Sequence, residues 1–194
     1  MSTTLAAPAS HELVVKHSRF LASAAPVADA DAAAAFIASA SVPDATHNCW
    51  AWRIGDAYRS SDDGEPAGTA GRPILAAIDG QGLDGVAVVV TRWYGGIKLG
   101  AGGLVRAYGG TAAECLRTAE RREVVERAEV DVECPFADIA AVHGALAAFD
   151  AEKLDEEFRA EGVRFRLRLP AARLEALATH LRDATRDRAR VGDP

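Results

Sequence analysis

Two glycine-rich segments carry most of the residues in this sequence that are suited to binding a charged ligand. Residues 62–73 contain three carboxylates and one arginine, and residues 91–108 contain two arginines and a lysine. Fourteen of the 17 glycines lie between Gly55 and Gly110. Glycine permits sharp turns and close approach of a ligand to the backbone. Loops that combine glycine with charge are typical of a shaped polar surface, so we expect function in this part of the chain.

The second segment has the pattern of an anion cradle. A loop over residues 95–103 lies between an expected strand and an expected helix. The first N–H groups of that helix would have no hydrogen-bond partner within the helix and would lie at the positive end of its dipole. We predict that Arg92, Lys98 and Arg106 contact phosphate, with polynucleotide phosphate favoured over a bound nucleotide. The Walker pattern fails, because Ala101 and Gly102 replace its Lys and Ser/Thr. The glycines expected to allow close backbone approach are Gly95, Gly96, Gly100, Gly102 and Gly103. A loop that uses them only for tight packing explains the sequence equally well.

The first segment is expected to form the rim of this surface. Its carboxylates have the chemistry for Mg²⁺ binding or acid–base work, but such a cluster is more typical of a solvated turn or of an anchor for a basic neighbour. His47 and Cys49 share a face of an expected strand, and a zinc site would need further ligands. We therefore predict no metal, no cofactor and no catalytic residue. The predicted rim residues are His47, Asn48, Asp62, Asp63, Glu65 and Arg72.

Aromatic residues and arginines elsewhere leave alternatives open. Trp93 and Tyr94 follow an apolar run, where aromatic side chains either pack in the core or lie exposed to stack on bases or dock a protein. Residues 163–169 alternate apolar residues with arginine, the pattern of a half-buried strand. We expect the exposed arginines to pair with acids across a hairpin, the alternative being a sheet that faces RNA. The arginines are Arg164, Arg166 and Arg168, and the acids are Asp155, Glu156 and Glu157.

Composition excludes some classes of protein. The net charge is −6, and residues 1–116 carry 8 basic and 11 acidic residues against 14 and 17 in the remainder, so each part has a charge of −3. This balance argues against a uniformly basic nucleic-acid-binding protein but allows a local basic patch. Three widely spaced cysteines indicate reduced thiols, and no secretory or membrane-spanning pattern is present. We expect a cytoplasmic protein without a membrane partner.

The composition changes near Arg117 from rich in glycine and apolar residues to densely charged, which predicts two α+β domains, over residues 1–118 and 119–194. In the first, Asp29 is a suitable N-cap for a helix, and residues 86–91 form an apolar, β-branched run typical of a strand buried on both faces. The predicted strands are 13–15, 19–22, 47–54, 57–60 and 86–91, and the predicted helices are 30–40, 69–78 and 104–118.

The second domain has a β-α-β-β-α pattern, which is most of a ferredoxin-like fold. A last strand is expected to be missing or very short, and residues 185–194 are expected to be frayed. The predicted strands are 124–132, 154–160 and 163–169, and the predicted helices are 136–149 and 170–182.

Four motifs together resemble the YigZ/IMPACT family. They are Ser18-Arg19-Phe20, residues 44–49 (DATHNC), residues 61–75 (SDDGEPAGTAGRPIL) and residues 89–108 (VVTRWYGGIKLGAGGLVRAY). The resemblance covers residues 12–118. It implies that the first domain has the fold of elongation factor G domain IV and of a ribosomal protein domain, and that the second is ferredoxin-like. Many members have Tyr-Phe where Trp93-Tyr94 stands, which keeps the aromatic character.

The resemblance and the motifs lead to three functional hypotheses. The first is a non-enzymatic, translation-linked or regulatory protein that binds RNA or ribosomal material through the glycine-rich basic loop. The second is a protein-docking module in stress or translation control, since the resemblance includes relatives with a different second module that regulate a translational kinase by binding its activator. The third is a small-molecule enzyme in which Asp62, Asp63 and His47 act on a phosphorylated substrate, which would need a closed pocket joining both glycine loops.

Overall fold

The computed structural model describes residues 2–192, which form two compact units. The first covers residues 2–124 and the second begins at residue 125. The boundary expected after residue 118 coincides with the end of helix α3 (Ala101–Thr118), and the strand that follows this helix belongs to the first unit. The two-domain α+β architecture is confirmed, and each unit is described below by itself.

A five-stranded antiparallel sheet forms the centre of the first unit, in the order β2-β3-β6-β4-β5. The central strand β6 is buried along nearly its whole length, as the apolar run predicted. Helices α1 and α2 provide the crossovers that lead from β3 to β4 and from β5 to β6. The strands are β2 (Ala9–Val15), β3 (Ser18–Pro26), β4 (His47–Ile54), β5 (Ala57–Ser61) and β6 (Val86–Trp93).

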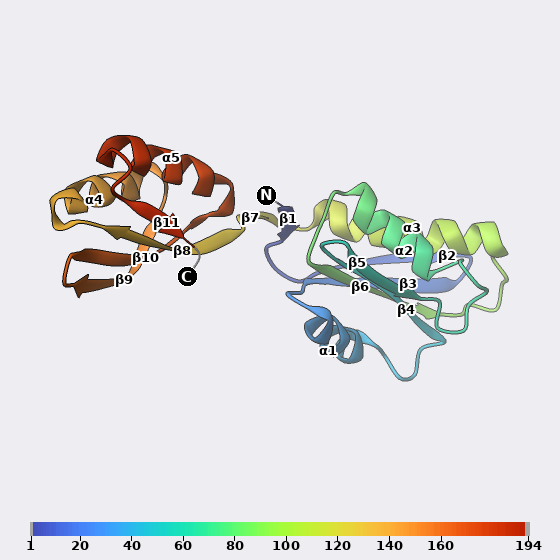
Figure 1. Ribbon diagram of the computed structural model, residues 1–194. Helices are drawn as coiled ribbons and strands as arrows, with labels where there is room; N and C mark the ends of the chain where they lie inside the picture. Colours follow the sequence, from blue (N-terminus) through green and yellow to red (C-terminus); the bar gives the residue numbers. More distant parts are fainter. Residues whose placement is uncertain (1, 193–194) are drawn as a thin grey trace. The chain divides into compact units, whose positions relative to one another are not determined.

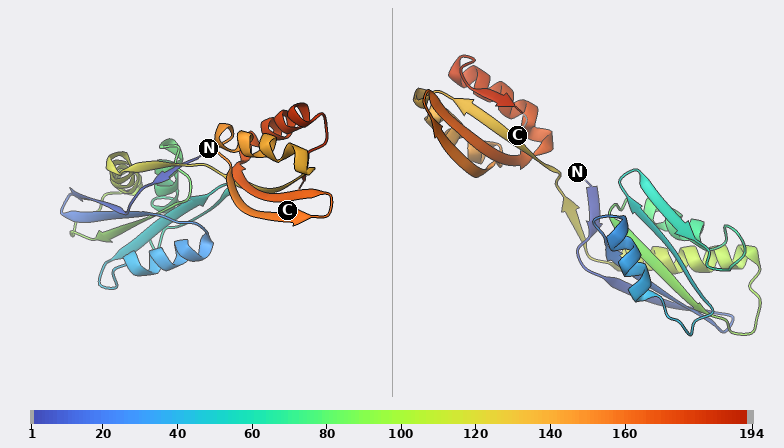
Figure 2. Two further views of the ribbon diagram at one scale, coloured as in Figure 1. Left: turned by 90° about the vertical axis from the view of Figure 1, so that its left-hand side faces the viewer. Right: turned by 60° about the horizontal axis from the view of Figure 1, so that its bottom comes forward.

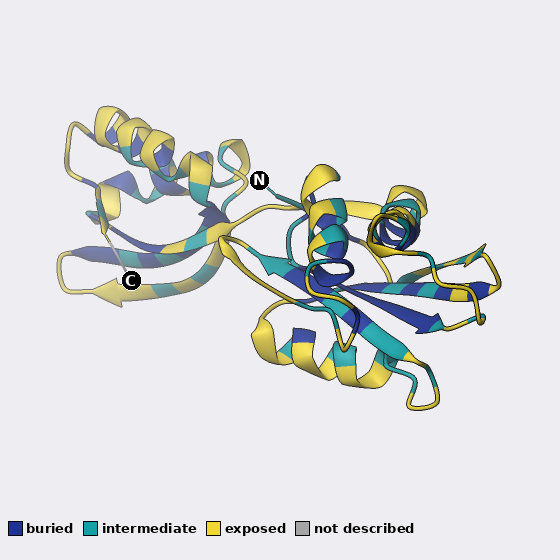
Figure 3. Ribbon diagram, turned by 90° about the vertical axis from the view of Figure 1, so that its right-hand side faces the viewer, coloured by how far each residue is buried: buried dark blue, intermediate teal, exposed yellow. Residues whose placement is uncertain are grey.

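Helices cover both faces of this sheet (Figures 1 and 2). Helices α2 (Gly71–Gly80) and α3 pack on one face over the larger core, and α1 (Ala30–Ala40) packs on the other over a smaller core. Asp29 caps α1 as expected, its carboxylate accepting a hydrogen bond from the Ala32 N–H. Buried residues therefore line both sides of the sheet (Figure 3).

One end of this sheet gathers the segments of the first domain that the sequence singled out. Strands β2, β5 and β6 end there, and β3 and β4 begin there, because adjacent strands are antiparallel. The connections at this end are residues 16–17, 62–70 and 94–100, together with the entry to β4 at His47. The topology thus brings the two glycine-rich segments to the same edge.

A short strand pair completes the first unit and was absent from our expectations. Strand β1 (Ser2–Leu5) pairs antiparallel with β7 (Arg121–Val124), with Leu5 opposite Arg121. Leu5 is fully buried in the larger core, so this pair anchors the start of the chain. Residues 121–124 are all exposed and three of the four are charged, and for that reason they lacked a strand pattern in the sequence.

The second unit has the ferredoxin-like topology that the sequence indicated. Its four-stranded antiparallel sheet has the order β11-β8-β10-β9, and two helices pack on one face. The expected frayed tail is wrong for residues 190–192, which form the very short last strand, while residues 193–194 lie outside the described residues. The elements are β8 (Arg127–Cys134), α4 (Ile139–Ala148), β9 (Glu152–Arg159), β10 (Gly162–Pro170), α5 (Leu174–Thr185) and β11 (Arg190–Gly192).

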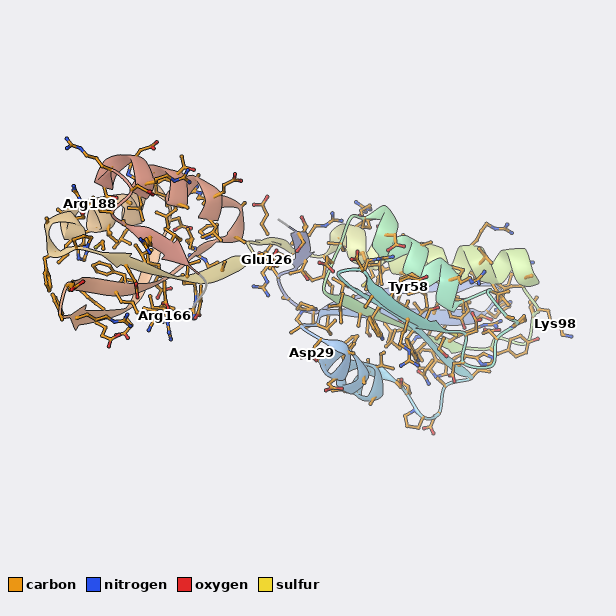
Figure 4. All side chains as sticks on the ribbon, viewed as in Figure 1. Asp29, Tyr58, Lys98, Glu126, Arg166 and Arg188 are labelled. Carbon is orange, nitrogen blue, oxygen red and sulfur yellow. The ribbon has the colours of Figure 1, made fainter. Side chains whose placement is uncertain are left out.

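The arginines of β10 pair mainly with acids of β8. Arg164 and Arg166 both bond Asp131, and Arg168 bonds Glu129 at 2.7 Å. The expected pairing across the β9–β10 hairpin is therefore largely wrong: acids of both β8 and β9 lie opposite these arginines in register, but the guanidinium groups make their shorter contacts with the β8 acids. Across the β9–β10 hairpin, Arg164 lies 4.0 Å from Glu157 and Arg168 lies 4.0 Å from Glu152. Figure 4 shows Arg166 on the sheet face away from the helices.

Within residues 2–192, no helix is both long enough and apolar enough to cross a membrane.

Candidate functional site

Asp62 organises the first glycine-rich segment. One carboxylate oxygen accepts hydrogen bonds from the Ala70 and Gly71 N–H groups at 2.9 and 2.8 Å, and the other accepts from Gly68 at 2.7 Å. These donors precede and begin α2, so Asp62 caps that helix from a distance. Burial alone would raise the pKa of Asp62, but the three N–H donors outweigh it and lower the pKa below its usual value. The Asp62 carboxylate therefore fixes the conformation of the loop that connects β5 to α2.

Asp63 and Asn48 hold the start of β4 in place. The Asp63 carboxylate accepts from the Asn48 N–H at 2.6 Å. The Asn48 side chain bonds both backbone groups of Val42 and accepts from the Thr91 hydroxyl at 2.9 Å. Of the predicted rim residues, Asp62, Asp63 and Asn48 thus make structural hydrogen bonds, and Arg72 is exposed.

The expectation that Arg92 lies on the surface to contact phosphate is wrong. Its guanidinium is 6% exposed and donates to the Glu65 carboxylate at 2.5 Å. Glu65, expected on the rim, is buried as well, with a side-chain exposure of 4%. The same Glu65 oxygen accepts from the Tyr108 hydroxyl at 2.7 Å, which ties α3 to this pair. Arg92 follows the apolar run of β6 and stays in the buried layer, where a carboxylate must balance its charge.

Arg92 also supports the loop that precedes α3. Its second amino group lies 3.3 Å from the Ser18 hydroxyl, which accepts from the Gly95 N–H at 3.2 Å. The guanidinium carbon lies 5.4 Å from the centre of the Tyr94 ring, within the range of a cation–π contact. Buried Arg92 is therefore the point where the two glycine-rich segments are joined.

His47 lies beside this pair at the start of β4. Its Nδ1 is 2.7 Å from the Asp63 carbonyl oxygen, and its Nε2 is 3.9 Å from the second Glu65 oxygen, Oε2. The ring is 21% exposed. Gly64 packs against it, and a Cβ at that position would lie 3.4 Å from Nδ1. His47 is thus the one predicted rim residue whose side chain reaches both Glu65 and solvent.

Cys49 is a poor candidate nucleophile. It is fully buried in the larger core, and its thiol donates to the Asp62 carbonyl at 2.9 Å. Burial raises the pKa of this thiol to about 12. A reactive cysteine needs a lowered pKa and access to solvent, so Cys49 has a packing role.

The glycines of the second segment serve two different purposes. A Cβ at Gly95 would come within 2.1 Å of the His17 carbonyl oxygen, and one at Gly103 within 2.9 Å of the Leu99 Cβ, so these two positions require tight packing. Gly96 and Gly100 have positive φ angles of 84° and 72°, which suit glycine. The space around Gly96 and Gly100 is open. The packing alternative therefore holds for part of the loop.

Lys98 and Arg106 lie on the surface around the start of α3. Both side chains are exposed, and neither has a carboxylate oxygen within 4.0 Å among residues 2–192. Figure 4 shows Lys98 pointing away from the sheet. A Cβ at Gly102 would lie 3.5 Å from an Arg106 amino group, so Arg106 folds back over the first turn of α3. The N-cap residue Gly100 has no side chain to bond the free N–H groups there.

Lys16 belongs to this surface and was missed in the sequence. It lies in the β2–β3 turn, is exposed, and lines a cleft of about 300 Å³ with Leu99 and Arg106. The cleft includes no residue from 62–73. In the sequence, the only signal for Lys16 was its position between the predicted strands 13–15 and 19–22, which indicates a turn. That pattern gives no information on which helix the turn approaches.

Trp93 and Tyr94 differ in exposure. Trp93 is half-buried beneath Arg19, whose guanidinium carbon lies 4.5 Å from the ring centre. Tyr94 is 45% exposed, and Ile97 in the same loop is 44% exposed. The loop therefore presents one aromatic and one aliphatic side chain to solvent next to Lys98.

Comparison with known proteins identifies the family. The Impact N-terminal domain matches residues 16–116, and a domain of unknown function, DUF1949, matches residues 132–188. This chain belongs to the IMPACT family. It is 54% identical to the IMPACT family member in the pol 5′ region of Thermus thermophilus, over 81% of this chain and 87% of that protein. It is 38% identical to the IMPACT family member YigZ of Escherichia coli K12, over 93% and 92% of the two chains.

Solved structures agree with this assignment. A crystal structure described as a hypothetical protein is 36% identical, covers all of this chain and 98% of its own, and has a TM-score of 0.70. A crystal structure of a Thermus thermophilus protein matches 98% of this chain with a TM-score of 0.52 at 13% identity, and this chain covers 28% of it. The second likeness concerns the fold alone.

Proposed function

We propose that this IMPACT family member is a non-enzymatic regulatory or translation-linked protein that binds structured RNA or ribosomal material. The binding surface is the end of the first sheet around the start of α3, with Lys16, Lys98 and Arg106 as its cations. Three free cysteines suit the reducing conditions of the cytoplasm, where we place this role.

The observation that supports this proposal most is the set of unpaired cations around free backbone N–H groups. Arg106 folds back toward the first turn of α3, and Gly100 leaves that turn without a side-chain cap. Helix N-termini attract phosphate through their N–H groups and dipole. The open space at Gly96 and Gly100 lets a phosphate approach the backbone. Arg92 supports the loop of this surface from its buried side, and it is not one of the residues that we propose to contact RNA.

A salt titration of RNA binding tests the proposal. Fluorescence anisotropy with a labelled RNA hairpin is measured from low to physiological salt for the full chain and for Lys98→Ala/Arg106→Ala. Each lost phosphate contact lowers the slope of log K against log salt by about 0.9 for a duplex. We expect the double variant to bind more weakly, with a slope lower by about 1.8.

A matched double variant controls for net charge. Arg59→Ala/Arg182→Ala removes two exposed arginines that are also without a carboxylate partner within 4.0 Å in residues 2–192. This control should keep the wild-type slope. Equal affinities and slopes for the wild type and both double variants would show that the surface does not bind RNA.

A protein-docking role is the second candidate, because three large apolar side chains are exposed near the same cations. Tyr94, Ile97 and Val105 are 45%, 44% and 40% exposed. Apolar side chains at the centre of an interface give binding with little salt dependence. Pull-down from cell extract before and after nuclease treatment separates the roles, since a docked protein survives nuclease and an RNA-bridged one is lost.

The enzyme hypothesis has less support. The carboxylates of Asp62 and Asp63, two of its three expected acid–base residues, already accept hydrogen bonds from backbone N–H groups. Of its three residues, only His47 has a side chain free for further chemistry.

A further inference from the structure

The cleft beside Lys16 combines an apolar lining with two cations. The apolar part comes from β2 on one side and from α3 with its preceding loop on the other. Lys16 and Arg106 complete the lining, and none of the described lining residues is acidic. The apolar lining residues are Leu13, Val15, Leu99, Gly103 and Ala107.

The apolar surface of this cleft is accessible. Leu13, Val15 and Leu99 are each partly buried, and the last two border the larger core rather than belonging to it. Ala107 is 3% exposed and is part of that core, so it closes the cleft toward the interior. Covering accessible apolar surface is favourable because that surface is removed from water. The cleft therefore suits an apolar group of a ligand.

The two cations are free to bind an anion. Lys16 and Arg106 are exposed, and neither has a carboxylate oxygen within 4.0 Å among residues 2–192. They come from different elements, the β2–β3 turn and α3, and both line the same cleft of about 300 Å³. Because the cleft is small, one anionic group in it lies within reach of both side chains.

The backbone of the β2–β3 turn fixes the position of Lys16. Lys16 and His17 have φ angles of 45° and 66°, so both residues of this two-residue turn are left-handed. Such turns match the twist of a hairpin. The turn also packs against the loop before α3, since a Cβ at Gly95 would lie 2.1 Å from the His17 carbonyl oxygen. Lys16 is therefore held beside the loop that carries Leu99.

A nucleotide with an unstacked base matches this cleft. It joins a flat apolar face to a phosphate within one monomer, whereas neighbouring residues of an extended peptide point to opposite sides. A base-paired duplex buries the faces of its bases and is recognised through phosphates, riboses and groove edges, so it would leave the apolar lining uncovered. At about 300 Å³ the cleft is at the lower end of the range for ligand sites, which fits a single base.

We infer that the cleft binds one unpaired nucleotide of RNA. The base packs on the apolar lining, and the phosphate contacts Lys16 and Arg106. This inference rests on the proposed RNA-binding function and names the part of a structured RNA that the surface recognises, a loop, a bulge or an end. The described lining residues have no side-chain hydroxyl, amide or carboxylate. The site therefore selects an unstacked base without selecting which of the four bases it is.

The test follows methyl groups of the cleft in the wild-type protein. The full chain with ¹³C-labelled leucine and valine methyl groups is titrated with adenosine 5′-monophosphate and with ribose 5-phosphate, which lacks the base. The ring current of a base shifts nearby methyl signals, so we expect only the nucleotide to shift Leu13, Val15 and Leu99. The nucleotide should also bind about fivefold more tightly, the low end for stacking one base on a side chain. Val14, 61% exposed on the opposite face of β2, is the internal control.

Two RNAs test whether the base belongs to an unpaired nucleotide. The hairpin used in the salt titration has an unpaired loop, and a fully paired duplex with the same number of phosphates has none. We expect the hairpin to shift the methyl signals of the cleft and the duplex to leave them unchanged.

A pair of neutral substitutions in β2 isolates the apolar lining. Leu13→Gln places a polar side chain in the cleft, whereas Val14→Gln makes the same kind of change on the opposite face of the strand. Leu13→Gln should weaken hairpin binding about fivefold but keep the salt slope, because both cations remain. Val14→Gln should keep both the affinity and the slope.

The outcomes separate this inference from the proposed function. The nucleotide site is overturned by absent methyl shifts, by equal binding of the nucleotide and ribose 5-phosphate, or by equal responses to hairpin and duplex. A salt slope that still falls in Lys98→Ala/Arg106→Ala would then keep the proposed function. Methyl shifts from an alternating Glu-Leu peptide but not from the hairpin also overturn the site and favour protein docking. Base-dependent shifts with an unchanged slope in that double variant keep the base in the cleft, with its phosphate on Lys16, and reject the wider cationic surface.

Discussion

Gly95 lies directly against the main chain of His17, where a Cβ on residue 95 would come within 2.0 Å of the His17 carbonyl carbon. This contact joins the β2–β3 turn to the loop that precedes α3. Because backbone rather than a flexible side chain occupies the space, neither segment can yield without moving the other. The contact therefore fixes where Lys16 stands relative to the Lys98 loop.

Gly95→Ala should destabilise the first unit and displace this turn. We expect a loss in the free energy of unfolding of about 2 kcal/mol, within the range for overpacking. The matched control is Gly110→Ala in the interior of α3, where nothing lies within 4 Å of the added Cβ. The control should stabilise the protein by about 0.5–1 kcal/mol. Urea unfolding followed by tryptophan fluorescence measures both, and an unperturbed Gly95→Ala protein would contradict the packing argument.

The buried pair of Arg92 and Glu65 predicts unequal mutational costs. Glu65→Ala leaves a guanidinium uncompensated in the core, and breaking such a pair typically costs about 3–5 kcal/mol. The double variant Glu65→Leu/Arg92→Met removes both charges and should be more stable than Glu65→Ala alone. Urea unfolding of the two variants checks this order. A double variant that is less stable than the single one would show that the pair contributes more than mutual charge balance.

Much of this fold was readable from local patterns. The cap at Asp29 and the β-branched run of residues 86–91 specify α1 and β6 through short-range physics, and both are confirmed. Strands β1 and β7 were missed because they are short, and their pairing joins residues more than a hundred positions apart. Pairing across such distances leaves no local signal.

The candidate site was harder to predict for an electrostatic reason. Arg92 extends an apolar strand buried on both faces, and that position should have indicated a buried charge with an acid nearby. Glu65 lies 27 residues earlier, in a segment expected to be a solvated rim. The sequence identified both residues as important but gave their roles as surface contacts, because the partner's position depends on the tertiary fold.

Asp62 predicts how the stability of the first unit depends on pH. Its folded pKa is lowered, so ionised Asp62 contributes stability above its usual value of about 4, and this contribution is lost as the pH falls through the folded pKa. Asp62→Asn should therefore be less stable than the wild type at pH 7, with the difference shrinking below about pH 4. Urea midpoints across pH measure it. Asp44→Asn, which removes a carboxylate from an exposed loop, serves as the control for the substitution itself, and a difference between Asp62→Asn and the wild type that persists in acid would contradict the role of the charge.

The end of the first unit predicts a difference between two truncations. A fragment of residues 1–124 keeps β7, whereas a fragment of residues 1–118 loses the partner of β1 and the bond from the Ala6 N–H to the Glu120 carbonyl, 2.8 Å long. Without β7, Leu5 is held less firmly in the core, and exposing a leucine costs about 2 kcal/mol. We expect both fragments to unfold cooperatively, with the shorter one at a lower urea concentration. Equal midpoints would place the boundary at residue 118 and make the β1–β7 pair dispensable, because an anchor that stabilises nothing cannot belong to the unit's core.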